Sequence, residues 1–305
     1  MRFTTQAVVV FALVLVIAGI GNVVFAQQGT NQPPPAKAKA KPATLAQAEP
    51  KTPERVRTEE TTKEMSLGGE DDVAERQSVD SYCSLEDGQP GKPGGFEIEL
   101  FSGWTKFRHE SEEIGLEPEL EYTLDGSEFL RNTQLQLSAP MQLGEGDVAG
   151  NGDLTFGWQQ RWVAENGSMP TLATLAQIRA PSGYHGSGVD GTLTGIVAKD
   201  IGPGTAIFNA WIKTANGHEI DDLRDFQWGG RIGYKWRISD QLAVIGDYVH
   251  QVSEETGHSN TNALELSAEY KINENISVGP GIIVGLDNHE ETPEIGAGVQ
   301  LHISF

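Results

Sequence analysis

Glutamate residues recur at alternate positions in two stretches of the chain, Glu97 with Glu99, and Glu117 with Glu119 and Glu121. Alternate side chains of an extended strand point to the same side and lie about 7 Å apart. Paired carboxylates at such a spacing could act as the acid and the base of a secreted glycosidase. The aromatic cleft that would hold a sugar is not legible in the sequence, so a charged wall is the alternative.

Later stretches add charged residues in the same alternating pattern. These further residues are Arg161, Arg179, Lys213, Arg231, Lys235, Arg237, Glu265 and Glu269. If the strands close into a ring, the early acids and the later cations fall on different arcs of the inner wall. We predict that the whole set lines a polar lumen, either as a field that orients dipolar solutes or as a salt-bridged plug.

Signals for catalysis are weak. The chain has no Gly-x-Ser-x-Gly elbow, no His-Glu-x-x-His helix and no phosphate-binding loop. One enzymatic alternative is a barrel lipase, in which His250, oriented by Asn262, would activate Ser253. We expect no catalytic residue and no cofactor.

Metal binding is also poorly supported. Two long loops are acidic, through Glu219, Asp221, Asp222, Asp225, Asp287, Glu290, Glu291 and Glu294. The ligand spacing of an EF-hand is absent from these loops, so we interpret them as solvated and expect no metal. Cys83 is the only cysteine, which excludes an intramolecular disulfide and a zinc site built from cysteines.

Charge and hydropathy exclude two broad classes. With 22 Lys and Arg against 43 Asp and Glu, the formal charge is −21, so we expect no nucleic-acid partner. After the N-terminus no apolar run approaches the roughly 20 residues of a membrane-spanning helix. The remaining classes are a secreted soluble domain and a transmembrane β-barrel, whose strands are only half apolar.

Composition divides the chain into three parts. Residues 1–26 have the apolar core and the small-residue end, at Ala26, of a secretory signal peptide; an uncleaved anchor helix is the alternative. Residues 27–94 are rich in Pro, Ala, Lys and Glu and predict a disordered periplasmic linker, because such a stretch buries too little apolar surface to order itself. Residues 95–305 alternate apolar and polar residues between glycine-rich turns.

The third part predicts twelve strands, an even number as bacterial outer-membrane barrels have. The expected strands are 95–107, 116–124, 129–139, 152–164, 171–180, 190–199, 203–213, 227–237, 241–252, 262–272, 275–286 and 295–305. The later connections alternate short and long, which favours an up-and-down barrel with its short turns in the periplasm over a sandwich.

One face of these strands is apolar. Strand 295–305 carries Ile295, Val299 and Phe305 on that face, and we predict that it contacts outer-membrane lipids. Aromatic residues near strand ends, Trp158, Trp162, Tyr248 and Tyr270, suit interfacial girdles. The terminal aromatic strand resembles the signal by which the barrel-assembly machinery recognises its clients.

Three segments resemble a known family. These are Gly150 to Gly157, Leu193 to Asp200 with the following Ile207 to Ala210, and the terminal aromatic strand. They are similar to the phenol-degradation MetA-pathway proteins, outer-membrane barrels described as transporters, over roughly residues 95–305. The resemblance implies a channel for passive uptake of small solutes, with aromatic or hydrophobic ones among them. An adhesin or receptor that acts through the acidic loops is the non-transport alternative.

Overall fold

The computed structural model describes residues 85–107, 112–143, 150–183, 188–214, 224, 226–253, 259–287 and 292–305. The chain divides into two units, Met1–Asp72 and Val73–Phe305, and every described residue belongs to the second. The expected signal peptide, most of the expected linker and Cys83 lie outside the described residues. The acidic loop residues Glu219, Asp221, Asp222, Asp225, Glu290 and Glu291 lie outside them as well.

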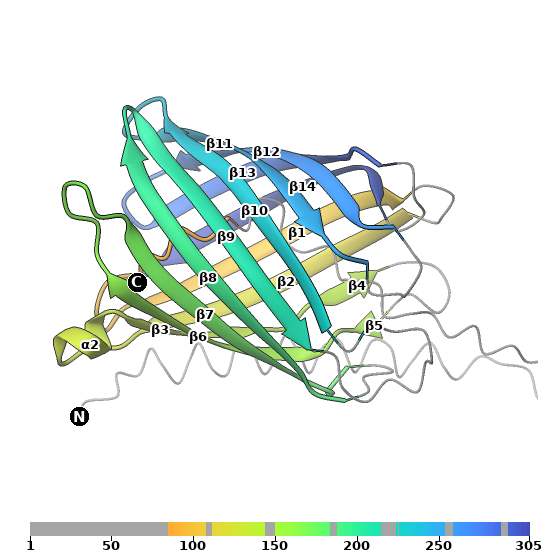
Figure 1. The fold of residues 1–305 in the computed structure, drawn as a ribbon, viewed down its shortest axis with the longest axis horizontal. Coiled ribbons are helices and arrows are strands. Elements are labelled where there is room, and N and C mark those ends of the chain that lie inside the picture. Colours follow the sequence, from red (N-terminus) through yellow and green to blue (C-terminus); the bar gives the residue numbers. More distant parts are fainter. Residues whose placement is uncertain are drawn as a thin grey trace, which may run out of the picture. The chain divides into compact units, whose positions relative to one another are not determined.

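The described unit is a closed antiparallel barrel (Figure 1). Its strands are β1 (Phe96–Phe107), β2 (Glu112–Thr123), β3 (Thr133–Ser138), β4 (Met141–Leu143), β5 (Gly150–Asn151), β6 (Leu154–Val163), β7 (Thr171–Ala180), β8 (Asp190–Ile201), β9 (Gly204–Thr214), β10 (Phe226–Arg237), β11 (Leu242–Gln251), β12 (Thr261–Lys271), β13 (Ile276–Gly285) and β14 (Pro293–Ser304). Sequential strands pair with each other, and β1 closes the ring by pairing with both β2 and β14.

Fourteen labelled segments make twelve wall strands. β3 and β4 both pair with β2 and are parts of one strand, interrupted at Ala139 and Pro140, where proline has no N–H to donate. β6 and β5 pair with β3 and β4 and form the next strand, interrupted at Gly152 and Asp153. The predicted twelve-stranded up-and-down barrel is therefore confirmed.

One predicted strand is wrong at its start. Residues expected to open the strand 129–139 instead form a helical turn, α2 (Glu128–Arg131), and the strand begins at Thr133. Ser127 caps this turn by accepting a hydrogen bond from the backbone N–H of Leu130, as N-terminal serines do. The alternation of Phe129 and Arg131 continued the strand pattern in the sequence, but the preceding Asp-Gly-Ser turn supplies a cap that favours a helix.

Large apolar side chains point outward along the wall. Trp228, Ile232 and Trp236 on β10 are each at least half exposed, and Val299 on β14 is exposed too. Exposed apolar side chains on alternate positions of every strand are the pattern of a lipid-facing wall. Within the described residues no helix is long and apolar enough to cross a membrane.

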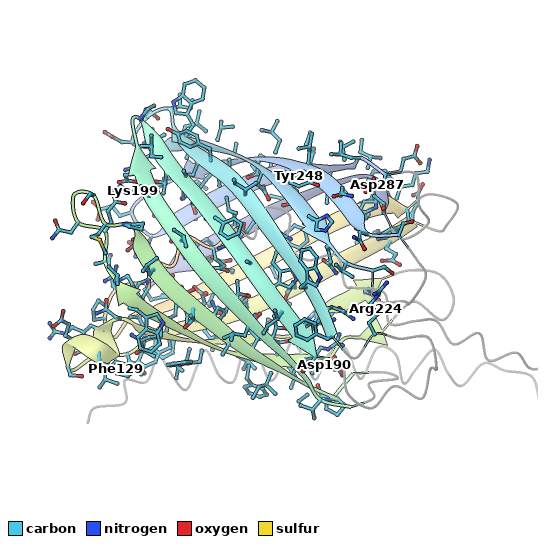
Figure 2. The ribbon with its side chains drawn as sticks, viewed as in Figure 1. Phe129, Asp190, Lys199, Arg224, Tyr248 and Asp287 are labelled. Carbon is cyan, nitrogen blue, oxygen red and sulfur yellow. The ribbon has the colours of Figure 1, made fainter. Side chains whose placement is uncertain are left out.

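The two ends of the barrel differ. Because neighbouring strands are antiparallel, every second connection lies at the same end. The tight turns at Gly202, Asp240 and Glu274 lie at the end that also holds the C-terminus, called here the short-turn end. Figure 2 shows Phe129 and Lys199 at this end, and Asp190 and Asp287 at the opposite, long-loop end.

Candidate functional site

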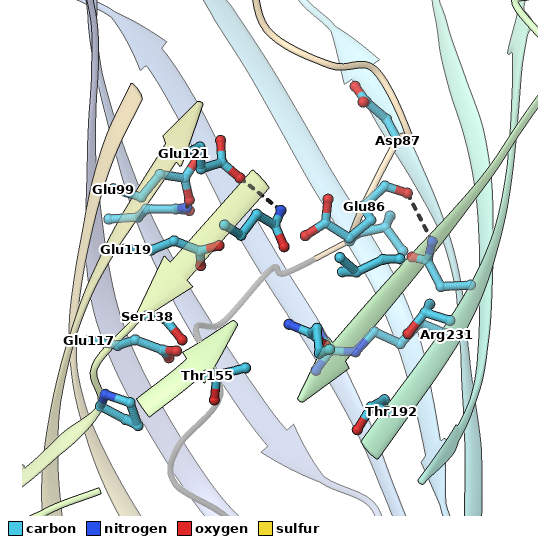
Figure 3. A pocket seen from close by; sticks show the side chains of 18 of the residues that line it. Glu86, Asp87, Glu99, Glu117, Glu119, Glu121, Ser138, Thr155, Thr192 and Arg231 are labelled. Carbon is cyan, nitrogen blue, oxygen red and sulfur yellow. Dashed lines mark hydrogen bonds between the residues drawn. The ribbon is translucent and has the colours of Figure 1, made fainter. Parts of the chain in front are cut away.

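The barrel encloses a cavity of about 570 Å³ (Figure 3). Most of the side chains that line it are polar, and they come from strands all round the wall and from residues just before β1. Each strand contributes alternate residues, because those between them point to the outside. The cavity is therefore lined mainly by polar and charged side chains.

β1 and β2 bring the predicted glutamates together. Glu97, Glu99, Glu117, Glu119 and Glu121 all line the cavity. The strand register sets Glu97 opposite Glu121 and Glu99 opposite Glu119. Like charges directly opposite each other repel, so this wall of carboxylates needs stabilising donors.

Neutral amides supply most of these donors. Gln134 and Gln136 on β3 donate to the two carboxylate oxygens of Glu121, at 2.7 and 2.9 Å. Gln300 on β14 donates to Glu99 at 2.6 Å. Amides satisfy the hydrogen bonding of a carboxylate without cancelling its charge. Within the described residues, no ion pair joins Glu99, Glu119 or Glu121 to a Lys or Arg side chain.

Glu97 has a different partner at the edge of the acidic wall. Its carboxylate lies 3.3 Å from Nε2 of His302 on β14, and His302 also lines the cavity. A protonated imidazole would offset the charge of Glu97, and His302 also lies opposite Glu99 in the register of β1 and β14.

The cations on the opposite arc are paired with acids on nearby strands. Arg231 on β10 contacts Glu265 on β12 at 3.2 Å, and Lys235 contacts Glu269 at 2.6 Å. Arg179 on β7 forms an ion pair with Asp190 on β8. Arg231 and Glu265 are almost fully buried. These pairs cancel the positive charge of their arc, so the field across the lumen is carried by the glutamates.

Three predicted lumen residues do not line the cavity. Glu265 lies beneath Arg231 as its partner. Arg161 donates to the Asn132 side chain and to Gln89 near the short-turn end. Arg237 pairs with Asp200 at 2.6 Å, and both are half exposed at the rim. Lys213 does line the cavity.

The lining is acidic as a whole. Ten carboxylic acids line the cavity against four Lys and Arg side chains. Two acids in this lining, Glu86 and Asp87, come from the segment that the sequence assigned to the linker. Charge alternation along strands could not have found them, because they precede the first strand. Gln134, Gln136 and Gln300 do follow the strand alternation, and a search for polar residues of any charge would have included them.

The expected lipase residues are only partly assembled. His250 Nδ1 lies 2.8 Å from Oδ1 of Asn262, whose amide donates to Asp287 at 2.5 Å. Ser253 is buried, at 3 % exposure, and no hydrogen bond joins it to His250 in the described part of the chain. The hydroxyl that a serine mechanism requires is thus not in contact with the imidazole.

The two acidic loop residues that the structure describes have ordinary partners. Asp287 accepts from Asn262, and Glu294 pairs with Lys106 at 3.0 Å. Across the described ranges, no group of three or more His, Cys, Asp or Glu is placed to hold a metal ion.

A closed antiparallel ring with an apolar outside and a charged inside defines the class of outer-membrane β-barrels. A family model described as "Putative MetA-pathway of phenol degradation" matches residues 76–303, and the chain belongs to this family. The resemblance found in the sequence is confirmed, and the match begins upstream of residue 95. No curated protein sequence matches the chain.

Several solved structures are similar to this chain. The COG4313 outer membrane channel from Pseudomonas putida F1 is similar with a TM-score of 0.61 and 10% identity, over 72% of this chain and 98% of that one. The NanC porin has a TM-score of 0.46 and 7% identity, over 68% and 98% of the two chains. Outer membrane phospholipase A from Escherichia coli has a TM-score of 0.42 and 9% identity, over 70% and 93%.

Proposed function

We propose that this barrel is a passive channel for small polar solutes and that its lumen favours cations. The observation that supports this most strongly is the wall of Glu99, Glu119 and Glu121, in which Glu99 and Glu121 accept from amides, facing cations that are already paired. A cleft lined by one sign of charge concentrates counter-ions. The similarity in fold to a COG4313 outer membrane channel supports transport over catalysis.

The polar lining bears on the class of solute. The family resemblance suggested aromatic or hydrophobic solutes, but the cavity wall offers them few apolar contacts. Apolar side chains such as Leu175, Trp211 and Ile245 are scattered among charged and amide groups. Small, hydrated or positively charged solutes fit such a wall better, because charged groups lose hydration when an apolar solute covers them.

Reversal potentials in planar bilayers test this proposal. Across a KCl gradient we expect the wild-type channel to prefer K⁺, and we expect the triple variant Glu99→Gln, Glu119→Gln, Glu121→Gln to lose this preference. A matched control removes three carboxylates outside the lumen, through Glu128→Gln, Glu165→Gln and Glu274→Gln. The difference should shrink in 1 M salt, where the Debye length is about 3 Å.

Two results would contradict the proposal. Conductance without any cation preference would show that the glutamates of the acidic wall do not act on the ions that cross the lumen. No conductance in a barrel that has assembled, as judged by its heat-modifiable migration on gels, would overturn the channel and favour an adhesin or receptor.

We also propose that β14 is recognised by the barrel-assembly machinery. Its outer face is apolar, and Phe305, which donates its backbone N–H to Phe96 at 2.8 Å, is 58 % exposed. An exposed aromatic beside the closing pair of strands leaves a surface for an assembly partner. Phe305→Ser should lower the amount of assembled barrel in cells without changing the conductance of the barrels that form. Equal amounts of assembled wild-type and Phe305→Ser barrels would contradict recognition of β14 by this machinery.

A further inference from the structure

The chain lies inside the barrel before its first strand begins. Residues 85–95, called here the strap, run along the inner wall and reach β1 at the short-turn end. Asn209 on β9 donates to the backbone carbonyl of Glu86 at 2.9 Å, and Gln89 donates to Thr171 on β7 at 3.0 Å. Both wall residues are almost fully buried. The strap is therefore docked by specific hydrogen bonds.

Gly88 fits the strap to the wall. Its φ is +70°, a conformation that favours glycine, and it is buried. A Cβ built on it would lie 2.8 Å from Cβ of Ala173 and 3.2 Å from Cγ2 of Ile196. The backbone thus approaches the wall as closely as it can, and a methyl group at this position would push it away.

Docking the strap places Glu86 in the cavity. Its side chain lines the space, and it interacts electrostatically with Glu99, Glu119 and Glu121 and with Arg231. Figure 3 shows Glu86 on the strap, in the space between the glutamates of β1 and β2 and Arg231 of β10. A solute that crosses the lumen therefore passes a carboxylate on the strap and carboxylates on the wall.

We propose that the strap narrows the lumen and that Glu86 is a selectivity-determining residue of the pathway. This inference rests on the channel function proposed above. It assigns part of the selectivity to a segment that is not a strand of the barrel, and it makes passage depend on how that segment is seated.

The first experiment measures the charge of Glu86. Burial, and then the neighbouring Glu99, raise the pKa of Glu86 to about 8, so the measurement is made at pH 9. In planar bilayers with a KCl gradient at that pH, Glu86→Gln should lower the K⁺ to Cl⁻ permeability ratio about twofold, because one of the facing carboxylates is lost. Glu274→Gln makes the same charge change at an exposed turn and should leave the ratio unchanged. A cation-selective wild type with an unaltered ratio in Glu86→Gln overturns the role of Glu86.

The second experiment unseats the strap. Gly88→Ala should raise single-channel conductance by about twofold, the scale expected when a segment leaves the lumen of a small barrel. Gly167→Ala is the matched control, since Gly167 has a φ of +59° with nothing within 4 Å of its added Cβ. Adding Ala173→Gly to Gly88→Ala removes the closest colliding methyl group and should return the conductance part of the way to the wild-type value, because the strain of the positive φ remains.

The outcomes separate this inference from the channel itself. If the wild type and Gly88→Ala conduct equally, the proposal that the strap narrows the lumen is overturned and the proposed channel function stands. If only Gly88→Ala conducts, the strap is supported and the wild-type barrel is closed by it. If neither the assembled wild type nor assembled Gly88→Ala conducts, both the channel function and the role of the strap are overturned. Should Gly88→Ala fail to assemble, the Glu86→Gln measurement decides.

Discussion

Glu99 on β1 lies directly opposite Glu119 on β2, and both line the cavity. The structure keeps these two carboxylates side by side, with an amide from Gln300 on Glu99 and with His302 opposite Glu99 on β14. Carboxylates that face each other repel, and such clusters are often found at functional sites.

The cation preference should depend on pH. Ionised carboxylates carry the charge of the wall, so the K⁺ preference should be largest at alkaline pH and should fall as the pH is lowered and the carboxylates are protonated. The triple variant Glu99→Gln, Glu119→Gln, Glu121→Gln should show little of this dependence. Reversal potentials measured over a pH series check the prediction, and an identical pH profile for both proteins would exclude these glutamates as its source.

The buried pair between Arg231 and Glu265 should respond unequally to single and double changes. Arg231→Leu leaves Glu265 buried beside another acid, Asp247, and should cost about 3 to 5 kcal/mol. Arg231→Leu with Glu265→Leu should cost less, because Glu265 is then no longer a buried charge that has lost its partner. Urea titration of the folded barrel in detergent micelles measures both, and equal losses would mean that the pair is not coupled.

Neighbouring positions on β14 should differ in their tolerance of a cation. Val299 points outward and Gln300 points into the lumen towards Glu99. Val299→Arg should cost about 2 to 4 kcal/mol, because it puts a charge into hydrocarbon. Gln300→Arg should cost little, since its guanidinium lies beside a carboxylate. Refolding into lipid vesicles at increasing urea compares them, and the reverse order would mean that the strand is inverted.

Processing and the expected linker can be tested together. We predict that the mature protein begins near Gln27, which mass spectrometry of the exported protein would show; an intact Met1 would contradict export through a cleaved signal. Deleting residues 27–84 should leave heat-modifiable migration unchanged, because few apolar side chains are lost. Failure of this deletion to assemble would give the segment a structural role.

The pattern of strands can be predicted from the amino-acid sequence alone. Alternation of apolar and polar residues, with turns at Gly202, Asp240 and Glu274, was enough to predict the ring of strands, because each strand separates lipid from lumen at every residue. The helical turn at Glu128–Arg131 could not be predicted in this way, since four residues show no helical period, and it overlaps the predicted strand 129–139.

Which charges of the lumen are paired with an opposite charge could be learned only from the folded chain. Alternation placed Glu99 and Arg231 on inward faces alike, but pairing depends on strands far apart in sequence, and the structure pairs Arg231 with Glu265 while Glu99 receives only an amide. It also placed Glu86 in the lumen. Composition assigned residues 85–94 to a linker. This segment forms hydrogen bonds with residues of the barrel wall, and such a segment needs no periodic sequence pattern of its own.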